Sequence, residues 1–154
     1  MYMDGLLLFD TALALTATQV STNVVDLVNA RDLGVGDDPA LDVVVQVQTA
    51  LLSAGATTLT VYIEGSTDNT TYTVYARTDA IPKASLVAGA KISLDLPRMP
   101  PQAAGRPRYL RMNYIVTTGP FTGGTLTAFI VVDDQQGVGS PNVLGYPPGI
   151  VIAN

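Results

Sequence analysis

The stretch RYLRMNYIVTTGPFTGGTLTAFIVVDD, residues 108–134, contains two segments in which apolar side chains recur at every second position. The two sets are Leu110, Met112, Tyr114 and Val116, and then Leu126, Ala128, Ile130 and Val132. This alternation places each set on one face of a β-strand. Between the two segments, residues 117–124 contain three glycines and a proline, which is typical of a turn. The pattern therefore predicts a β-hairpin that closes the core of the protein.

The opposite face of these two segments is mixed. It carries the polar residues Arg111, Asn113 and Thr127, but also the apolar residues Ile115, Phe129 and Val131. A face that contacts only water would not present Phe129 and Val131 together. We therefore expect this face to be covered by the rest of the same protein, with a partner protein as the alternative.

The remaining chain repeats the same alternation between turns rich in glycine, asparagine and aspartate. One more hairpin loop is predicted at residues 65–69, and one short helix at Ile81–Ala88, because Pro82 suits a first helical turn and Gly89 a helix end. About eight strands with almost no helix predict an all-β fold, a jelly-roll-like antiparallel β-sandwich. The predicted strands outside residues 108–134 are 12–16, 20–28, 41–49, 57–64, 70–77 and 91–96.

Three regions are predicted: an N-terminal arm at residues 1–10, the β-sandwich domain at 11–134, and an extended C-terminal arm at 135–154. The C-terminal arm has three prolines and four glycines in QQGVGSPNVLGYPPGIVIAN, so it cannot form a regular element. Its apolar side chains are too few to offset the entropy of ordering it alone. We expect a neighbouring polypeptide to cover both arms, with packing onto the chain's own domain as the alternative.

Composition excludes several functional classes. Only 14% of residues are charged and the net charge is −5, which argues against binding nucleic acid through its phosphates. The chain has no cysteine and no histidine, so it lacks thiolate ligands, the most common zinc ligand and the most common general base. No run of 18 apolar residues predicts a membrane span, and the apolar run Leu6–Phe9 is too short for a signal-peptide core. The sequence thus predicts a soluble protein that is not exported.

Few side chains suggest catalysis or metal binding. The adjacent carboxylates Asp37–Asp38 and Asp133–Asp134 are expected to be solvated rather than catalytic. A weak calcium site at Asp68, Asn69 and Asp79 is less consistent with the pattern than a turn-forming role for these residues. A hydroxyl nucleophile would have only Lys83 or Lys91 as its activating base, and nothing in the pattern arranges them. We expect no enzyme activity, no cofactor, no metal and no small-molecule substrate.

Aromatic and basic residues allow two interpretations each. Four tyrosines could form a stacking platform for a sugar or for single-stranded nucleic acid, but cross-strand packing within a sheet is more common. Three arginines could pair with acidic groups of a partner subunit or with acidic groups of the chain's own surface. The residues concerned are Tyr62, Tyr72, Tyr75 and Tyr109, and Arg106, Arg108 and Arg111.

Three segments, taken in order, resemble the capsid cement proteins of tailed phages, of the Bordetella-phage type. They are MYMDGLLLFDTALALTATQVSTNVVDLVNARDLGVGDDPALDVVVQV (1–47), AIPKASLVAGAKISLDLP (80–97) and RYLRMNYIVT (108–117). None of them is a catalytic signature, and the specificity lies in their order. The resemblance covers roughly residues 1–134, and the segment after Asp134 is longer than expected for the family.

The resemblance implies a jelly-roll protein, made in the host cytoplasm, that binds the outside of the icosahedral shell without enzyme activity. There it would clamp major capsid protein subunits of adjacent capsomers and associate with itself as a dimer or trimer. The alternative is a carbohydrate- or receptor-binding jelly-roll module that uses the tyrosines. The residues expected to contact partners are Tyr2, Leu6, Leu7, Leu8, Phe9, Arg106, Arg108, Arg111, Phe129, Leu144, Tyr146, Ile150, Val151 and Ile152.

Overall fold

Ten β-strands and two short 3-10 helices form within residues 5–30, 33, 41–97 and 105–132, the part of the chain that the computed structural model describes. No helix in these ranges is long and apolar enough to cross a membrane. The strands are β1 (Leu8–Ala14), β2 (Gln19–Val20), β3 (Val25–Asp26), β4 (Leu41–Leu52), β5 (Thr58–Ser66), β6 (Thr73–Arg77), β7 (Ile81–Pro82), β8 (Lys91–Asp95), β9 (Tyr109–Thr117) and β10 (Gly123–Val132). The 3-10 helices are η1 (Gly5–Leu7) and η2 (Lys83–Ser85).

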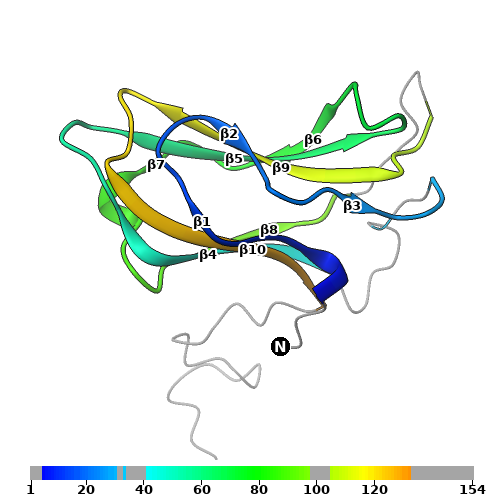
Figure 1. The fold of residues 1–154 in the computed structure, drawn as a ribbon, viewed down its shortest axis with the longest axis horizontal. Coiled ribbons are helices and arrows are strands. Elements are labelled where there is room, and N and C mark those ends of the chain that lie inside the picture. Colours follow the sequence, from blue (N-terminus) through cyan, green and yellow to red (C-terminus); the bar gives the residue numbers. More distant parts are fainter. Residues whose placement is uncertain (1–4, 31–32, 34–40, 98–104, 133–154) are drawn as a thin grey trace, which may run out of the picture.

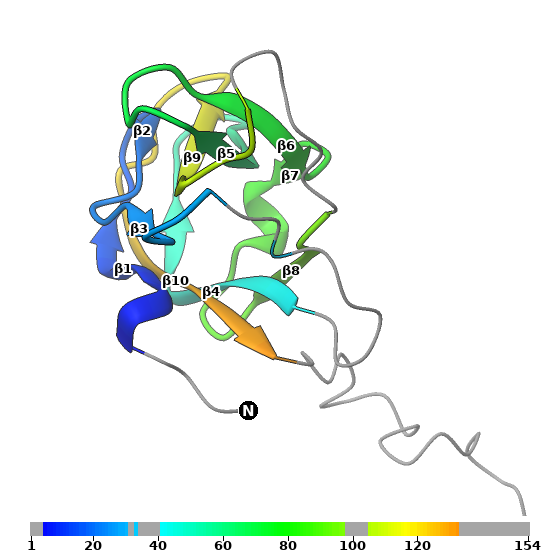
Figure 2. The same cartoon turned by 90° about the vertical axis from the view of Figure 1, so that its right-hand side faces the viewer.

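The strands form two antiparallel sheets that pack as two layers (Figures 1 and 2). Sheet A has the strand order β1-β10-β4-β8. Sheet B has the order β2-β9-β5-β6, with β3 also paired to β9 and β7 to β5. Successive long strands mostly alternate between the two sheets, as the two interlocked Greek keys of a jelly roll require. The predicted all-β, jelly-roll-like sandwich is confirmed.

The predicted hairpin of residues 108–134 is wrong, because its two strands belong to different sheets. β9 pairs with β5 in sheet B, whereas β10 pairs with β1 and β4 in sheet A. The connection between β9 and β10 crosses from one layer to the other. Phe121 fixes it there: its ring is buried, and its backbone N–H donates to the carbonyl of Thr16 at 2.9 Å. The alternation of apolar residues shows which face of each strand is buried. It does not show which strand is its neighbour.

The hairpin predicted around residues 65–69 is confirmed, since β5 and β6 are adjacent and antiparallel. The predicted helix at Ile81–Ala88 is wrong, because this segment forms β7 and then the single turn η2. Leu86 ends that turn with its side chain in the core, and its carbonyl accepts a hydrogen bond from Leu51 of β4 at 3.0 Å. The helix therefore does not continue beyond η2, because Leu86 is buried in the core and hydrogen-bonded to β4.

The segment 20–28, predicted as one strand, contains only the short strands β2 and β3. Between them, the hydroxyl of Ser21 donates to the carbonyl of Asn23 at 2.8 Å and accepts the N–H of Met112 at 3.1 Å. Side-chain hydrogen bonds of this kind compete with the regular pairing of a strand. They leave this edge of sheet B irregular.

The main core lies between the sheets, and the inward faces predicted for the longer strands are confirmed. The buried side chains include Val43, Val45, Val47, Leu59, Val61, Ile63, Leu110, Met112, Tyr114, Leu126, Ala128 and Ile130. A second buried cluster on the other face of sheet A contains Val44, Phe129 and Val131, with Leu8 packed against it. Phe129 is only 2% exposed in the single chain, so the same protein covers the part of the predicted mixed face that lies on β10. The part on β9, with Arg111, Asn113 and Ile115, lies on the outer face of sheet B and is partly exposed.

A buried hydrogen bond joins the two sheets through the core. The hydroxyl of Tyr114, on β9, donates to the carboxylate of Asp10, on β1, at 2.6 Å, and both residues are fully buried. The other carboxylate oxygen accepts the N–H of Thr22 at 2.7 Å. Burial, reinforced by the nearby Asp10 carboxylate, raises the pKa of Tyr114 well above its ordinary value of 10.0.

This shift predicts a loss of stability at high pH. Above the pKa of an unfolded tyrosine, about 10, the unfolded chain releases the Tyr114 proton whereas the folded protein retains it. The free energy of unfolding should then fall by about 1.4 kcal/mol per pH unit from this group. Tyr114→Phe should lack that component, which urea unfolding at pH 8 and pH 11 would measure. If both proteins lost the same free energy of unfolding between pH 8 and pH 11, the result would contradict the buried pair of Tyr114 and Asp10.

Candidate interaction surface

The predicted N-terminal arm enters the sandwich earlier than residue 10. Leu6 is 84% exposed, but Leu7 packs against the main core and Leu8 against the second cluster. Phe9 is 0% exposed and belongs to the main core of the sandwich. Its apolar character is therefore explained by packing within the chain, and the same holds for Phe129, so neither is an accessible contact residue. The other predicted contacts, Tyr2, Leu144, Tyr146, Ile150, Val151 and Ile152, lie outside the described residues.

The outer face of sheet B gathers polar and aromatic side chains from neighbouring strands. The pairing of β5 with β9 sets Glu64 opposite Arg111 and Tyr62 opposite Asn113. These residues alternate with the inward-facing Ile63 and Met112, so their side chains lie on the face turned away from the core.

Three of these side chains, together with Tyr72 from the segment before β6, form one connected group. We call it the Arg111 cluster: Glu64, Tyr72, Arg111 and Asn113. Glu64 is only 6% exposed, and its two carboxylate oxygens accept Arg111 Nε at 2.7 Å and Asn113 Nδ2 at 2.8 Å. The guanidinium of Arg111 lies over the ring of Tyr72, 3.6 Å from its centroid. Burial raises the pKa of Tyr72, whose hydroxyl donates to Asn69. The cluster therefore holds an arginine and a tyrosine in fixed positions.

A second pair lies at the end of the same face. Arg108 forms two hydrogen bonds to the carboxylate of Asp26, each 2.8 Å long, and lies over the ring of Tyr109 at 4.9 Å from the centroid. The hydrogen bond from Arg108 holds the pKa of Asp26 below its ordinary value. Arg108 and Arg111 thus pair with acidic groups of their own chain, whereas Arg106 is exposed.

The tyrosines predicted as a possible stacking platform differ in their surroundings. Tyr72 and Tyr109 each have one ring face covered by an arginine. Tyr75 packs against the main core, and Tyr62 is half-buried on β5. Packing within the chain, which the sequence favoured, is seen for Tyr75, whereas Tyr72 and Tyr109 contact arginines.

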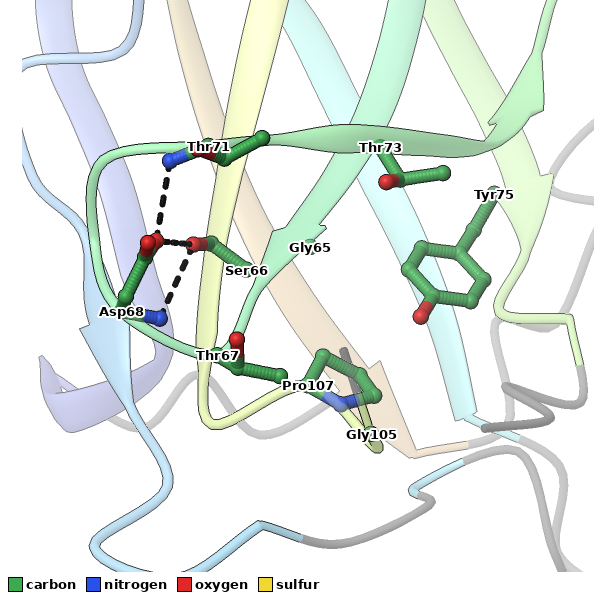
Figure 3. Close-up of a pocket in the computed structure, with 9 residues that line it drawn as sticks. All are labelled: Gly65, Ser66, Thr67, Asp68, Thr71, Thr73, Tyr75, Gly105 and Pro107. Carbon is green, nitrogen blue, oxygen red and sulfur yellow. Dashed lines mark hydrogen bonds between the residues drawn. The ribbon is translucent and has the colours of Figure 1, made fainter. Parts of the chain in front are cut away.

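The sequence did not predict a small pocket of about 170 Å³ beside the β5–β6 loop (Figure 3). Thr73 and Tyr75 of β6 form one wall, Gly105 and Pro107 the opposite wall, and Gly65 lies between them. A Cβ atom on Gly65 would lie 2.7 Å from the Tyr75 ring and 2.9 Å from Pro107, so glycine is required for this close approach. A single glycine in a loop-forming sequence carries no signal for such a pocket.

At the loop end of the pocket, Asp68 organises the turn. One carboxylate oxygen accepts the N–H groups of Thr70 and Thr71, each at 2.9 Å, and the hydroxyl of Ser66 at 2.8 Å. The hydrogen bond from the Thr71 N–H is the largest cause of a pKa well below the ordinary range for Asp68. This is the turn-forming role that the sequence favoured over calcium binding. No group of three potential metal ligands among His, Cys, Asp and Glu occurs within the described ranges.

A comparison with curated proteins finds no match for this chain. A comparison with protein families finds one over most of the sandwich: the family model for Bbp16 matches residues 9–130, from Phe9 in β1 to Ile130 in β10. The matched region includes both sheets, the Arg111 cluster and the pocket. The chain therefore belongs to the Bbp16 family, a family of Bordetella phage proteins.

Proposed function

We propose that this protein is a capsid cement protein of a tailed phage. It binds the outer surface of the icosahedral shell and clamps adjacent major capsid protein subunits, and it associates there as a dimer or trimer. It uses no cofactor and catalyses no reaction. The observation that carries the proposal is membership of a phage protein family over residues 9–130, which is nearly the whole sandwich.

The side-chain chemistry of the sandwich supports a structural role. The buried or partly buried carboxylates of Asp10 and Glu64 accept hydrogen bonds from neighbouring side chains, and that of Asp26 is paired with Arg108. Asp10 joins the two sheets through the core, whereas Glu64 and Asp26 hold the arginines on the outer face of sheet B. A rigid body of this kind suits a protein that must hold several subunits at fixed distances.

Cementing requires contact area spread over several subunits rather than one tight site. Each contact can be weak, because simultaneous engagement multiplies the individual affinities. The exposed side chains of Leu6 and Arg106 remain candidates for such contacts. The apolar residues of the C-terminal arm, residues 135–154, are further candidates from the sequence.

The test is co-sedimentation of the purified full-length chain with shells assembled from the major capsid protein. We expect the chain to sediment with the shells in a fixed ratio to the shell protein, and to raise the temperature at which the shells open. Removal of residues 135–154 should lower occupancy without lowering the unfolding temperature of the sandwich. Unchanged occupancy would contradict a role for the arm, and no sedimentation of the complete chain would refute the cement function.

The alternative is a carbohydrate- or receptor-binding module, for which Tyr62 and the pocket residue Tyr75 remain candidates. Glycan-array binding that is lost in Tyr62→Ala or Tyr75→Ala, in a chain that does not associate with shells, would favour it.

A further inference from the structure

Strand β6 ends sheet B on the side away from β2. It pairs with β5 through Tyr62, Ile63, Glu64 and Gly65, and no other described strand pairs with it. An end strand presents main-chain N–H and C=O groups along its outer edge, to which another extended segment can pair.

The edge at β6 has some of the devices that protect the edges of natural sheets, namely Arg77 at its end and the register shift at Tyr75, but it lacks others. Its sequence is Thr-Val-Tyr-Ala-Arg, without proline, lysine or an acidic residue. Thr73 is exposed and Val74 is 44% exposed, which is high for a valine on a strand. By contrast, β8 at the end of sheet A begins with Lys91 and finishes with Asp95, charges that discourage pairing with a further strand.

The pocket described above lies directly beside this edge (Figure 3). A register shift between β5 and β6 leaves Tyr75 as an extra residue, in the manner of a β-bulge, and bulges redirect side chains. The Tyr75 ring lines the pocket together with Thr73, so alternate residues of the edge strand face it. Peptides that add to a sheet edge gain affinity from main-chain hydrogen bonds and specificity from pockets for alternate side chains.

Charge at the two ends of β6 restricts the partner. Arg77 is exposed and forms no ion pair within the part of the chain that the structure describes. At the other end, Asp68 is exposed and its low pKa keeps it ionised. A complementary segment therefore carries a carboxylate near Arg77 and a basic or neutral residue near Asp68.

We infer that the β6 edge and its pocket form a strand-addition site for an extended segment of the shell protein. The segment pairs with the main chain of Thr73–Arg77, inserts one apolar side chain into the pocket, and places a carboxylate beside Arg77. The pocket volume of about 170 Å³ fits one side chain rather than a larger ligand. This inference rests on the proposed cement function, because it names the surface through which the chain holds the shell.

The first experiment measures binding of full-length variants to shells assembled from the major capsid protein. Thr73→Arg blocks the mouth of the pocket, and Arg77→Glu reverses the charge at the end of the edge. Each should raise the concentration needed for half occupancy at least tenfold. Lys91→Glu is the matched control, with the same charge change on the edge strand of the other sheet, and should bind as the unchanged chain does. Equal unfolding temperatures exclude misfolding as the cause.

Wild-type-like binding by both β6 variants would overturn the strand-addition site and leave the cement function standing. Failure of the unchanged chain to bind would overturn both.

The second experiment measures amide hydrogen exchange in residues 73–77, with and without shells. Exchange should slow at least tenfold on binding, while residues 91–95 of β8 should be unaffected. If residues 73–77 already exchange as slowly without shells, and ultracentrifugation shows a dimer, the occupant of the edge is a second copy of this chain. That result would overturn the assignment to the shell protein. Slowing confined to another edge would also overturn it.

Discussion

Replacing Phe9 by alanine should lower the free energy of unfolding by about 3–5 kcal/mol, the usual cost of truncating a buried phenylalanine. Phe9 is fully buried in the main core, although it follows three leucines that read as an exposed arm. The truncation removes apolar contacts and leaves a cavity that β1 and its neighbours fill only in part. Urea unfolding followed by circular dichroism would measure the change.

Leu6→Ala provides the matched control, three residues earlier in the same apolar run. Its side chain is 84% exposed, so the free energy of unfolding should change by less than about 0.5 kcal/mol. If Phe9 acted only as a contact for a partner, Phe9→Ala would instead weaken binding to shells and leave the unfolding curve of the isolated chain unchanged. Similar small effects of both substitutions would show that β1 does not hold Phe9 in the core.

The difference between Leu6 and Phe9 could not be read from the sequence, because a continuous apolar run contains no alternation. Four consecutive apolar residues, 6–9, lie in different environments: exposed, against the main core, against the second cluster, and within the main core. In the long strands the alternation was informative, and it correctly predicted the buried faces of β4, β5, β9 and β10. Partners of those strands depend on contacts distant in sequence, so the pairing of β9 with β10 was predicted wrongly.

Contacts between residues distant in sequence also could not be predicted for the candidate site. Arg108 and Arg111 were identified as a basic group, but their acidic partners, Asp26 and Glu64, are 82 and 47 residues away in the sequence. No local pattern connects positions so far apart, whereas the register of the sheets brings them together. The pocket at β6 depends on a register shift and on Gly65, and neither has a periodic signal. Asp68 was predicted correctly as a turn residue because its hydrogen bonds are local.

Replacing Gly124 by alanine should cost about 3 kcal/mol or more of the free energy of unfolding, through backbone strain and overpacking together. Gly124 has φ +121°, a conformation that residues with a side chain rarely adopt. A Cβ atom there would lie 2.5 Å from Leu51 Cδ2 and 2.6 Å from the carbonyl oxygen of Ala50. The backbone of β4 would have to move away from β10, and this is the most extensive strand contact of sheet A. Thermal and urea unfolding would both report the loss.

The neighbouring Gly123→Ala is the control for the lost flexibility of glycine itself. A Cβ atom on Gly123 has no atom within 4 Å, and its φ lies outside the left-handed region, so the change should stay within about 0.5 kcal/mol. The two residues lie at the register shift between β10 and β4, and only the second approaches the partner strand closely. If the two substitutions had equal effects, Gly124 would not lie against β4. β10 lies between β1 and β4 in sheet A. Such a result would therefore contradict the register of β10 against β4, and with it the strand order of the sheet.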